Sequence, residues 1–276
     1  MPEQVCHFLV SMELEMRRLV VIGAGILSIA GLTGAASAAD LPARVYTKAP
    51  AISAPLYDWS GFYAGLNGGG ASSHNCWTLT NSRGNPVPSA PSEGCHDATG
   101  GVVGGQIGYR FQMASWVFGV EAQGDWADLK GSNTSATGTF GHLPFLNQTK
   151  IDAIGLFTGQ VGYAWNNVLW YAKGGAAVTH DTYNGVVQFP VGAFPAGFAF
   201  DQASETRWGG VVGTGVEFGI APGWSVAAEY DHLFMGSSSQ NLINTAGGFD
   251  RTDSVKQDVD MGTVRVNYTF GGPAKN

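Results

Sequence analysis

Five residues in the second half of the chain are of the types that form a nucleophilic triad. Ser225 is a candidate nucleophile, His180 or His232 a candidate base, and Glu229 or Asp231 a candidate acid that orients the imidazole. No spacing among them requires the three groups to meet. His232 shares the parity of the apolar residues in its segment, which predicts a place at the lipid interface or the loop rim, away from Ser225. We therefore expect a protein without enzymatic activity.

A second set of reactive side chains flanks two cysteines. His74 and Cys76, together with Cys95 and His96, could supply four soft ligands to a metal ion. The alternative is a disulfide, which an exported chain favours because its compartment is oxidising. We expect a Cys76–Cys95 disulfide that closes a polar loop, with no metal site and no cofactor.

Export is indicated by the first 38 residues. Arg17 and Arg18 precede an uncharged apolar run over residues 19–32, and small residues at 36–38 suit cleavage. Residues 1–15 are acidic, and we interpret them as an extension upstream of a start at Met16. The predicted organisation is a signal peptide at 1–38, a periplasmic proline-containing linker at 39–57, a folded domain at 58–270 and a C-terminal tail at 271–276.

Composition limits the fold class. The 276 residues include 41 glycines, with 13% charged, 44% hydrophobic and 12% aromatic residues. A glycine content this high with so few charges disfavours a helical enzyme, and the apolar content disfavours disorder. The formal net charge of -7 gives no support to a nucleic-acid partner.

Short segments of alternating polarity, rich in glycine, valine and aromatic residues, begin after the linker. Three tight connections, at 113–115, 166–167 and 221–223, alternate with four long ones, at 72–100, 128–149, 182–205 and 236–257. This alternation predicts an all-β fold, an eight-stranded antiparallel transmembrane β-barrel with short periplasmic turns and four long extracellular loops. The predicted strands are residues 60–71, 101–112, 116–127, 150–165, 168–181, 206–220, 224–235 and 258–270.

The two faces of these segments differ in polarity. In the last segment Val264 and Val266 alternate with Thr263 and Arg265. A soluble barrel would turn the apolar face inward, but a small barrel cannot easily house most of eight tryptophans. A membrane barrel instead faces lipid with its apolar side and gathers opposite charges inside, where they can pair. The predicted lumen charge network is Arg110, Glu121, Asp125, Lys173, Arg207, Glu217, Glu229 and Arg265.

Aromatic residues cluster near the tight connections. Amphipathic rings prefer a membrane–water interface, although aromatic residues are also enriched in strands generally. The predicted membrane-interface aromatics are Tyr109, Trp116, Tyr163, Trp165, Trp170, Trp224, Tyr268 and Phe270.

Several ordered motifs resemble one family. They are Ala39-Asp40-Leu41-Pro42-Ala43-Arg44, Tyr46-Thr47-Lys48-Ala49-Pro50, Trp59-Ser60-Gly61-Phe62-Tyr63-Ala64-Gly65, Val161-Gly162-Tyr163-Ala164-Trp165, Gly213-Thr214-Gly215-Val216-Glu217 and Val266-Asn267-Tyr268-Thr269-Phe270. The set is similar to the alphaproteobacterial outer-membrane surface proteins of the OmpA-like β-barrel superfamily. This resemblance implies an eight-stranded barrel that the outer-membrane assembly machinery inserts through its C-terminal strand, and a surface antigen of the cell envelope. Porin-like or haemin-binding behaviour is implied for some members.

The expected function follows from the size of the barrel. Eight strands enclose an interior just wide enough for side chains, so free diffusion of nutrients is not expected. We expect a structural or interaction protein of the outer membrane, in contact with lipid and lipopolysaccharide, whose loops meet host or envelope ligands. The alternative is a narrow porin-like channel or a receptor for haemin or another small ligand. In the haemin version the loop aromatics Trp77, Phe140, Phe194 and Phe198 would lie beside His74, His96 or His142 as axial ligands.

Overall fold

A computed structural model of the protein describes residues 57–140 and 143–270. The predicted signal peptide, all but the last residue of the predicted linker, and the tail lie outside the described residues. Within the described ranges there is no helix long and apolar enough to cross a membrane. The strands there are β1 (Gly61–Ser82), β2 (Asn85–Pro86), β3 (Ser92–Met113), β4 (Trp116–Phe140), β5 (Leu143–Trp165), β6 (Val168–Val187), β7 (Ala199–Ala221), β8 (Trp224–Asn244) and β9 (Phe249–Phe270).

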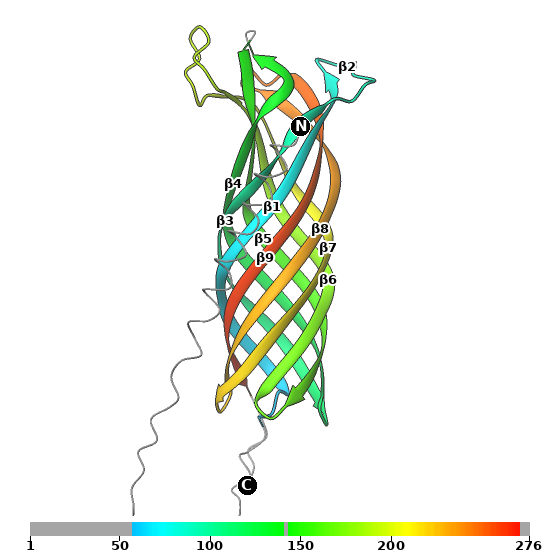
Figure 1. Ribbon diagram of the computed structural model, residues 1–276, viewed down its shortest axis with the longest axis vertical. Coiled ribbons are helices and arrows are strands. Elements are labelled where there is room, and N and C mark those ends of the chain that lie inside the picture. Colours follow the sequence, from blue (N-terminus) through cyan, green and yellow to red (C-terminus); the bar gives the residue numbers. More distant parts are fainter. Residues whose placement is uncertain (1–56, 141–142, 271–276) are drawn as a thin grey trace, which may run out of the picture. The chain divides into compact units, whose positions relative to one another are not determined.

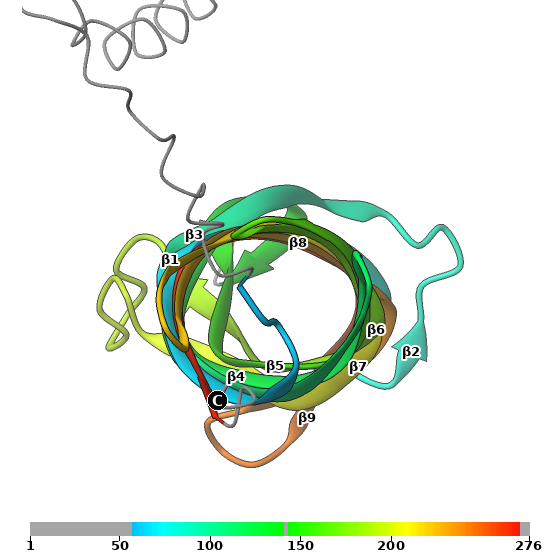
Figure 2. The same ribbon diagram turned by 90° about the horizontal axis from the view of Figure 1, so that it is seen from below.

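The long strands form a closed antiparallel ring (Figure 1). Each pairs with its neighbours in chain order, and β1 pairs with both β3 and β9, which removes the free edges that an open sheet would carry. The view along the ring shows this closure (Figure 2). β2 has only two residues and pairs with Asn81 and Ser82 of β1. The described residues thus hold nine strands rather than the predicted eight.

Two-residue turns join the strands at one end of the ring, which we call the turn end. They are Ala114-Ser115, Asn166-Asn167 and Pro222-Gly223. Ala114, Asn166 and Gly223 have φ of 54°, 56° and 78°, the left-handed conformation that tight hairpins require. The other end, which we call the loop end, carries the connections 83–91, 188–198 and 245–248. The residues between β4 and β5 lie outside the described ranges.

The prediction of four long loops is wrong for most of those residues, because the strands continue into them. β1 remains paired with β3 as far as Thr78↔Ser92, and β8 with β9 as far as Ile243↔Phe249. The reason is visible in β9. Toward the turn end Val264 faces outward and Arg265 inward, whereas toward the loop end Asp258 and Asp260 face outward and Val259 inward. The outer face of this strand changes from apolar to polar along its length, so a search for a continuous apolar face ends before the strand does.

Candidate functional site

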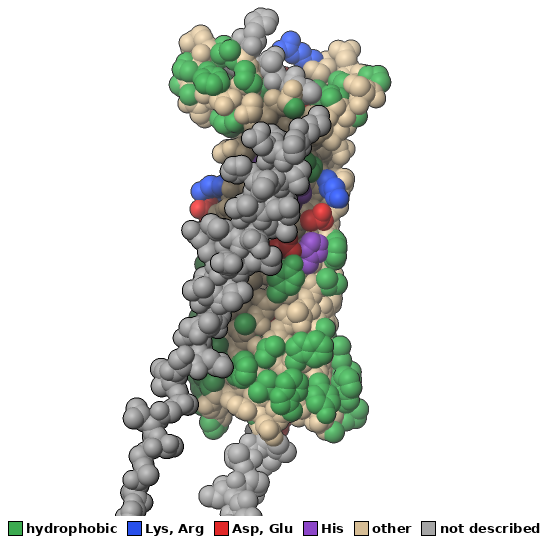
Figure 3. All heavy atoms as spheres, viewed as in Figure 1, with side chains coloured by type: hydrophobic (Ala, Val, Ile, Leu, Met, Phe, Trp, Pro, Cys, Tyr) green, Lys and Arg blue, Asp and Glu red, His purple; other side chains and the backbone are tan. Residues whose placement is uncertain are grey.

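The outer face near the turn end is an apolar belt. All eight predicted interface aromatics lie on it with exposed fractions between 37% for Tyr268 and 55% for Phe270. Their rings contact one another across strands, with centroids 5.5 Å apart for Trp116 and Tyr163 and 5.1 Å for Trp224 and Tyr268. Figure 3 shows hydrophobic side chains gathered at this end and charged ones farther up. Such a belt suits acyl chains bounded by an interfacial aromatic girdle.

Charged and histidine side chains mark where the apolar belt ends. His232 Nδ1 lies 2.7 Å from Asp260 Oδ1, and Tyr230 donates to the same oxygen at 2.5 Å. Lys130 pairs with Asp128 at 2.8 Å on the same outer face. The outward Asp260, which departs from the parity of β9, is therefore partnered at the boundary of the belt.

An arginine in the apolar belt should destabilise the protein strongly. Ile107 is exposed in the middle of the outward row of β3, and Ile107→Arg should cost about 2–4 kcal/mol because lipid cannot solvate the charge. Ser72→Arg, on the outer side of β1 beside Asp260, should cost less than about 1 kcal/mol. Urea unfolding in lipid vesicles measures both. Equal losses would contradict the assignment of the belt to lipid.

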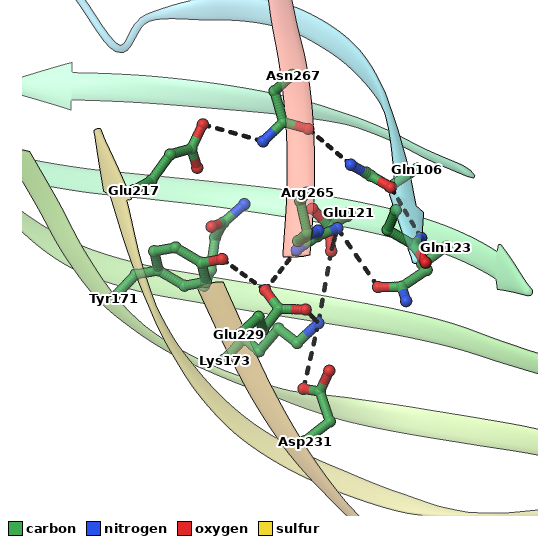
Figure 4. Close-up of polar contacts among 12 residues, drawn as sticks. Gln106, Glu121, Gln123, Tyr171, Lys173, Glu217, Glu229, Asp231, Arg265 and Asn267 are labelled. Atoms are coloured by element: carbon green, nitrogen blue, oxygen red, sulfur yellow. Dashed lines mark hydrogen bonds and ion pairs between the residues drawn. The ribbon is translucent and has the colours of Figure 1, made fainter. Parts of the chain in front are cut away.

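Inside the ring near the turn end lies an ionic cluster, shown in Figure 4. Arg265 Nη2 lies 2.8 Å from Glu121 Oε1, and its Nη1 also donates to Glu229. Lys173 Nζ lies 2.6 Å from Glu229 Oε1 and 3.2 Å from Asp231 Oδ1. All five side chains are buried, so each charge is compensated by partners rather than by bulk water.

A second branch of the turn-end cluster centres on Arg110. Its Nη1 lies 2.8 Å from Glu217 Oε2, and its guanidinium lies 4.3 Å from the centroid of the Tyr63 ring. Glu217 Oε1 accepts hydrogen bonds from Ser225 and, at 2.9 Å, from Asn267 Nδ2. Asn267 continues the network to Gln106 at 2.7 Å. These bonds link β1, β3, β7, β8 and β9 across the lumen.

Two tyrosines cap this cluster in the same way on opposite sides. Tyr63 donates to Glu121 at 2.6 Å and Tyr171 donates to Glu229 at 2.5 Å, each across 58 residues of sequence. A Cβ at Gly108 would lie 2.5 Å from the Tyr63 ring, and one at Gly215 would lie 2.5 Å from the Tyr171 hydroxyl, so only glycine admits either ring. Sequence reasoning missed both tyrosines, although each is followed by its glutamate after the same 58 residues.

The eight predicted lumen residues all lie inside the ring, but not in one network. Six of them make the ion pairs of the turn-end cluster. Asp125 joins through Gln123, which donates to it at 2.8 Å. Arg207 lies apart, nearer the loop end, where it pairs with Glu205 at 2.5 Å.

An apolar layer crosses the ring between the turn-end cluster and the loop end. Every long strand contributes at least one buried side chain to it, and the thirteen side chains form a single contact cluster. The layer is bordered by buried polar side chains, since Ser73 pairs with Val259 and Thr179 with Ile154 on neighbouring strands. Its members are Ala71, Ala98, Val102, Leu129, Ile151, Ile154, Leu156, Ala177, Val211, Leu233, Met235, Val259 and Met261.

A second ionic group, which sequence reasoning missed, lies inside the ring at the loop end. Arg251 donates to Asp201 and Glu93, each at 2.8 Å, and to Asn147 at 3.0 Å. Asp253 Oδ2 lies 3.1 Å from the same guanidinium. All five residues lie in segments that the sequence analysis predicted to be loops, because those segments are polar, and the structure places all five on strands.

The stability of the loop end should depend on pH through Asp253, which lies beyond the apolar belt. Burial raises the pKa of Asp253 to about 7, and Glu93 and Asp201 add to the rise while Arg251 opposes it. The folded chain thus holds a proton that the unfolded chain releases near pH 4. Its stabilising contribution is complete below that pH and is lost as pH rises through about 7.

Hydrogen exchange of the loop-end amides measures this dependence. Protection in the wild type should fall between pH 5 and pH 8 once the intrinsic exchange rate is corrected. Asp253→Asn should make the protection nearly independent of pH in that interval. An unchanged slope in this variant would contradict the assignment to Asp253.

Three of the four candidate ligands lie together, with the ligand atoms of His74, Cys76 and Cys95 within 4.8 Å of one another, but His96 points to the other face. Cys76 and Cys95 face each other on β1 and β3 and form a disulfide. His74 is exposed and contacts Asp97 at 2.6 Å, whereas His96 is buried inside, 2.7 Å from Asn133 and 3.0 Å from Thr149. Oxidised sulfur and histidines on opposite faces of the strands do not make a four-ligand metal site.

The triad candidates are also separated by the wall of the ring. Ser225, Glu229 and Asp231 face the interior, whereas His180 and His232 face outward. His180 lies 3.4 Å from Thr206 and His232 contacts Asp260.

The aromatic residues predicted for a haemin site do not lie together. Trp77 is buried inside against Tyr183, while Phe194 packs on Phe198 in the 188–198 connection. His142 lies outside the described residues, and nothing is described of the Phe140 side chain.

A strand ring that is apolar outside and ionic within, as this one is near its turn end, is a membrane-embedded β-barrel. The chain belongs to the outer membrane protein beta-barrel family, whose domain model matches residues 24–270. It is 29% identical over 245 residues to the 31 kDa outer-membrane immunogenic protein of Brucella melitensis, which covers 85% of this chain and 93% of that protein. These matches identify an outer-membrane protein.

Solved structures of lower similarity include two outer-membrane proteins. The outer membrane protease OmpT of Escherichia coli is 10% identical with a TM-score of 0.43, over 76% of this chain and 97% of that one. The attachment invasion locus protein Ail of Yersinia pestis is 14% identical with a TM-score of 0.35, over 75% and 99%.

Proposed function

We propose that this protein is a structural and interaction protein of the outer membrane rather than an open channel or an enzyme. Its eight long strands form the transmembrane barrel, the turn end faces the periplasm, and the loop end stands above the bilayer. The barrel is the rigid support, and the loop-end connections are the surface offered to the environment.

The apolar layer carries this proposal. A passive pore needs a continuous polar path, and a packed ring of Leu, Ile, Val, Met and Ala side chains from all long strands interrupts it. Trp59 adds a second barrier at the turn end, where it is buried with Val117, Leu169 and Tyr171. The outward placement of the histidines relative to Ser225 supports the absence of triad chemistry.

The proposed partners follow from the two zones of the outer surface. The apolar belt contacts acyl chains, and the charged rim above it meets lipopolysaccharide headgroups. The C-terminal strand β9, which ends at Phe270, is the segment that the assembly machinery would recognise. The immunogenic Brucella relative supports exposure of the loop end at the cell surface.

Planar-bilayer recording tests the proposal. The mature protein in concentrated KCl should give no stable current steps, because ions cannot cross the apolar layer. Stable ohmic steps would favour the narrow channel instead. Titration with haemin should leave its absorption spectrum unchanged, and a new Soret band would favour the receptor.

A further inference from the structure

The pairing between β7 and β8 is interrupted toward the loop end. Gly210 pairs with Phe234, and Gln202 pairs with Ile243, but between these two pairs the register is irregular and no regular pairing joins residues 203–209 to 235–242. Their other edges are occupied, since 203–209 pair with β6 and 236–242 pair with β9. Each stretch therefore has one free backbone edge, and the two edges face each other. We call residues 203–209 and 235–242 the seam window.

Side chains close the inner side of the seam window. Ser238 donates to Glu205 at 2.9 Å, and Gln240 donates to Ser238 at 2.8 Å. Arg207 holds the other oxygen of Glu205. These side-chain contacts join the two strands on the lumen side. They do not supply backbone pairing between the two edges of the window.

A groove of about 1010 Å³ runs along the outer side of this seam. Thr182, Gln202, Ser204, Ser239 and Asn241 line it with hydroxyl and amide groups. Its lining includes His180 and Asp201 but no Phe, Tyr or Trp, the rings on which sugars usually stack. The groove suits a partner that is recognised by hydrogen bonds to its main chain.

The seam window above Trp208 must lie in water. An unpaired backbone group costs several kcal/mol in hydrocarbon, so a free edge cannot face lipid. The last outward aromatic residues on these strands, Trp208 and Phe234, mark the end of the apolar belt, and the outward residues beyond them include Thr206, Ser239 and Asn241. The window is thus open to soluble partners above the bilayer.

We propose that the seam window binds an extended polypeptide segment, which adds a strand to the free edge of β8. Main-chain hydrogen bonds supply the affinity in this mode of recognition. The β8 edge is the better platform because Gly236, Ser237, Ser238 and Ser239 are small and let another backbone approach closely. The polar groove favours a segment with small polar side chains.

The test uses the full mature protein in lipid nanodiscs and a synthetic, end-capped peptide of seven alternating serine and threonine residues. Hydrogen exchange followed by residue-resolved mass spectrometry reports on those amides of residues 235–242 that point toward β7 rather than toward β9. They should exchange rapidly in the free protein and about tenfold more slowly with saturating peptide. A peptide of the same sequence with N-methylated backbone amides is the matched control and should give no protection.

One protein variant locates the binding site. Ser239→Trp fills the groove and should weaken peptide binding about tenfold, whereas Ser132→Trp, exposed on β4 away from the seam, should leave it unchanged. Slow exchange, without peptide, of the amides of residues 235–242 that point toward β7 would overturn the proposal, as would equal protection by the N-methylated peptide. Protection by lipopolysaccharide oligosaccharide with none by the peptide would assign the groove to a saccharide and also overturn it.

Discussion

Arg265→Met should destabilise the protein by about 3–5 kcal/mol, the cost of leaving a buried ionic group without its partner. Arg265 is fully buried and is the shared partner of Glu121 and Glu229. Without it, Lys173 alone must compensate both carboxylates and Asp231. Equilibrium unfolding in urea, followed by tryptophan fluorescence in lipid vesicles, measures the loss.

Two controls separate this cost from the loss of any positive charge. Lys130→Met removes an exposed lysine that pairs with Asp128, and it should cost less than about 1 kcal/mol. Arg265→Met combined with Glu121→Gln removes one of the uncompensated charges and should recover part of the stability. Similar losses for Arg265→Met and Lys130→Met would show that the turn-end cluster is hydrated rather than buried.

Leu129→Ala should cost about 2–5 kcal/mol, because it opens a cavity in the packed apolar layer. Leu129 has no exposed surface and contacts its neighbours inside the ring. Leu66→Ala is the matched control. Leu66 faces outward from β1 with 73% of its surface exposed, and acyl chains can fill the space that its side chain leaves.

The comparison of these two leucines tests the filled interior directly. Both substitutions remove the same atoms, so the difference in unfolding free energy reports only the surroundings. A water-filled lumen would make Leu129→Ala as mild as Leu66→Ala, and that result would contradict the apolar layer on which the proposed function depends. The same urea titration serves for both variants.

The alternation of polarity near the turn end was readable from the sequence, because side chains of a strand point to opposite faces in turn. Val264 and Arg265 are neighbours in the sequence and point to opposite faces, as do Trp224 and Ser225. In each pair the structure places the apolar residue outside and the polar residue inside. The two-residue turns were recognisable for the same local reason, since 166–167 and 222–223 contain residues that adopt left-handed backbone conformations.

The tertiary structure alone decided where the strands end and which charges meet. Above the belt the outer face meets water instead of lipid, so its outward residues, such as Asp258, are polar, and an inward residue such as Val259 is apolar. The apolar-outside alternation that marks the membrane part of the strand therefore does not continue there. Arg251 and Glu93 are 158 residues apart, and no periodicity predicts that closure of the ring brings them within 2.8 Å. The sequence by itself determined which face of each membrane strand is apolar, because apolar residues recur there at every second position. The partners across the lumen and the break between β7 and β8 depend on the register of distant strands, which only the closed ring sets.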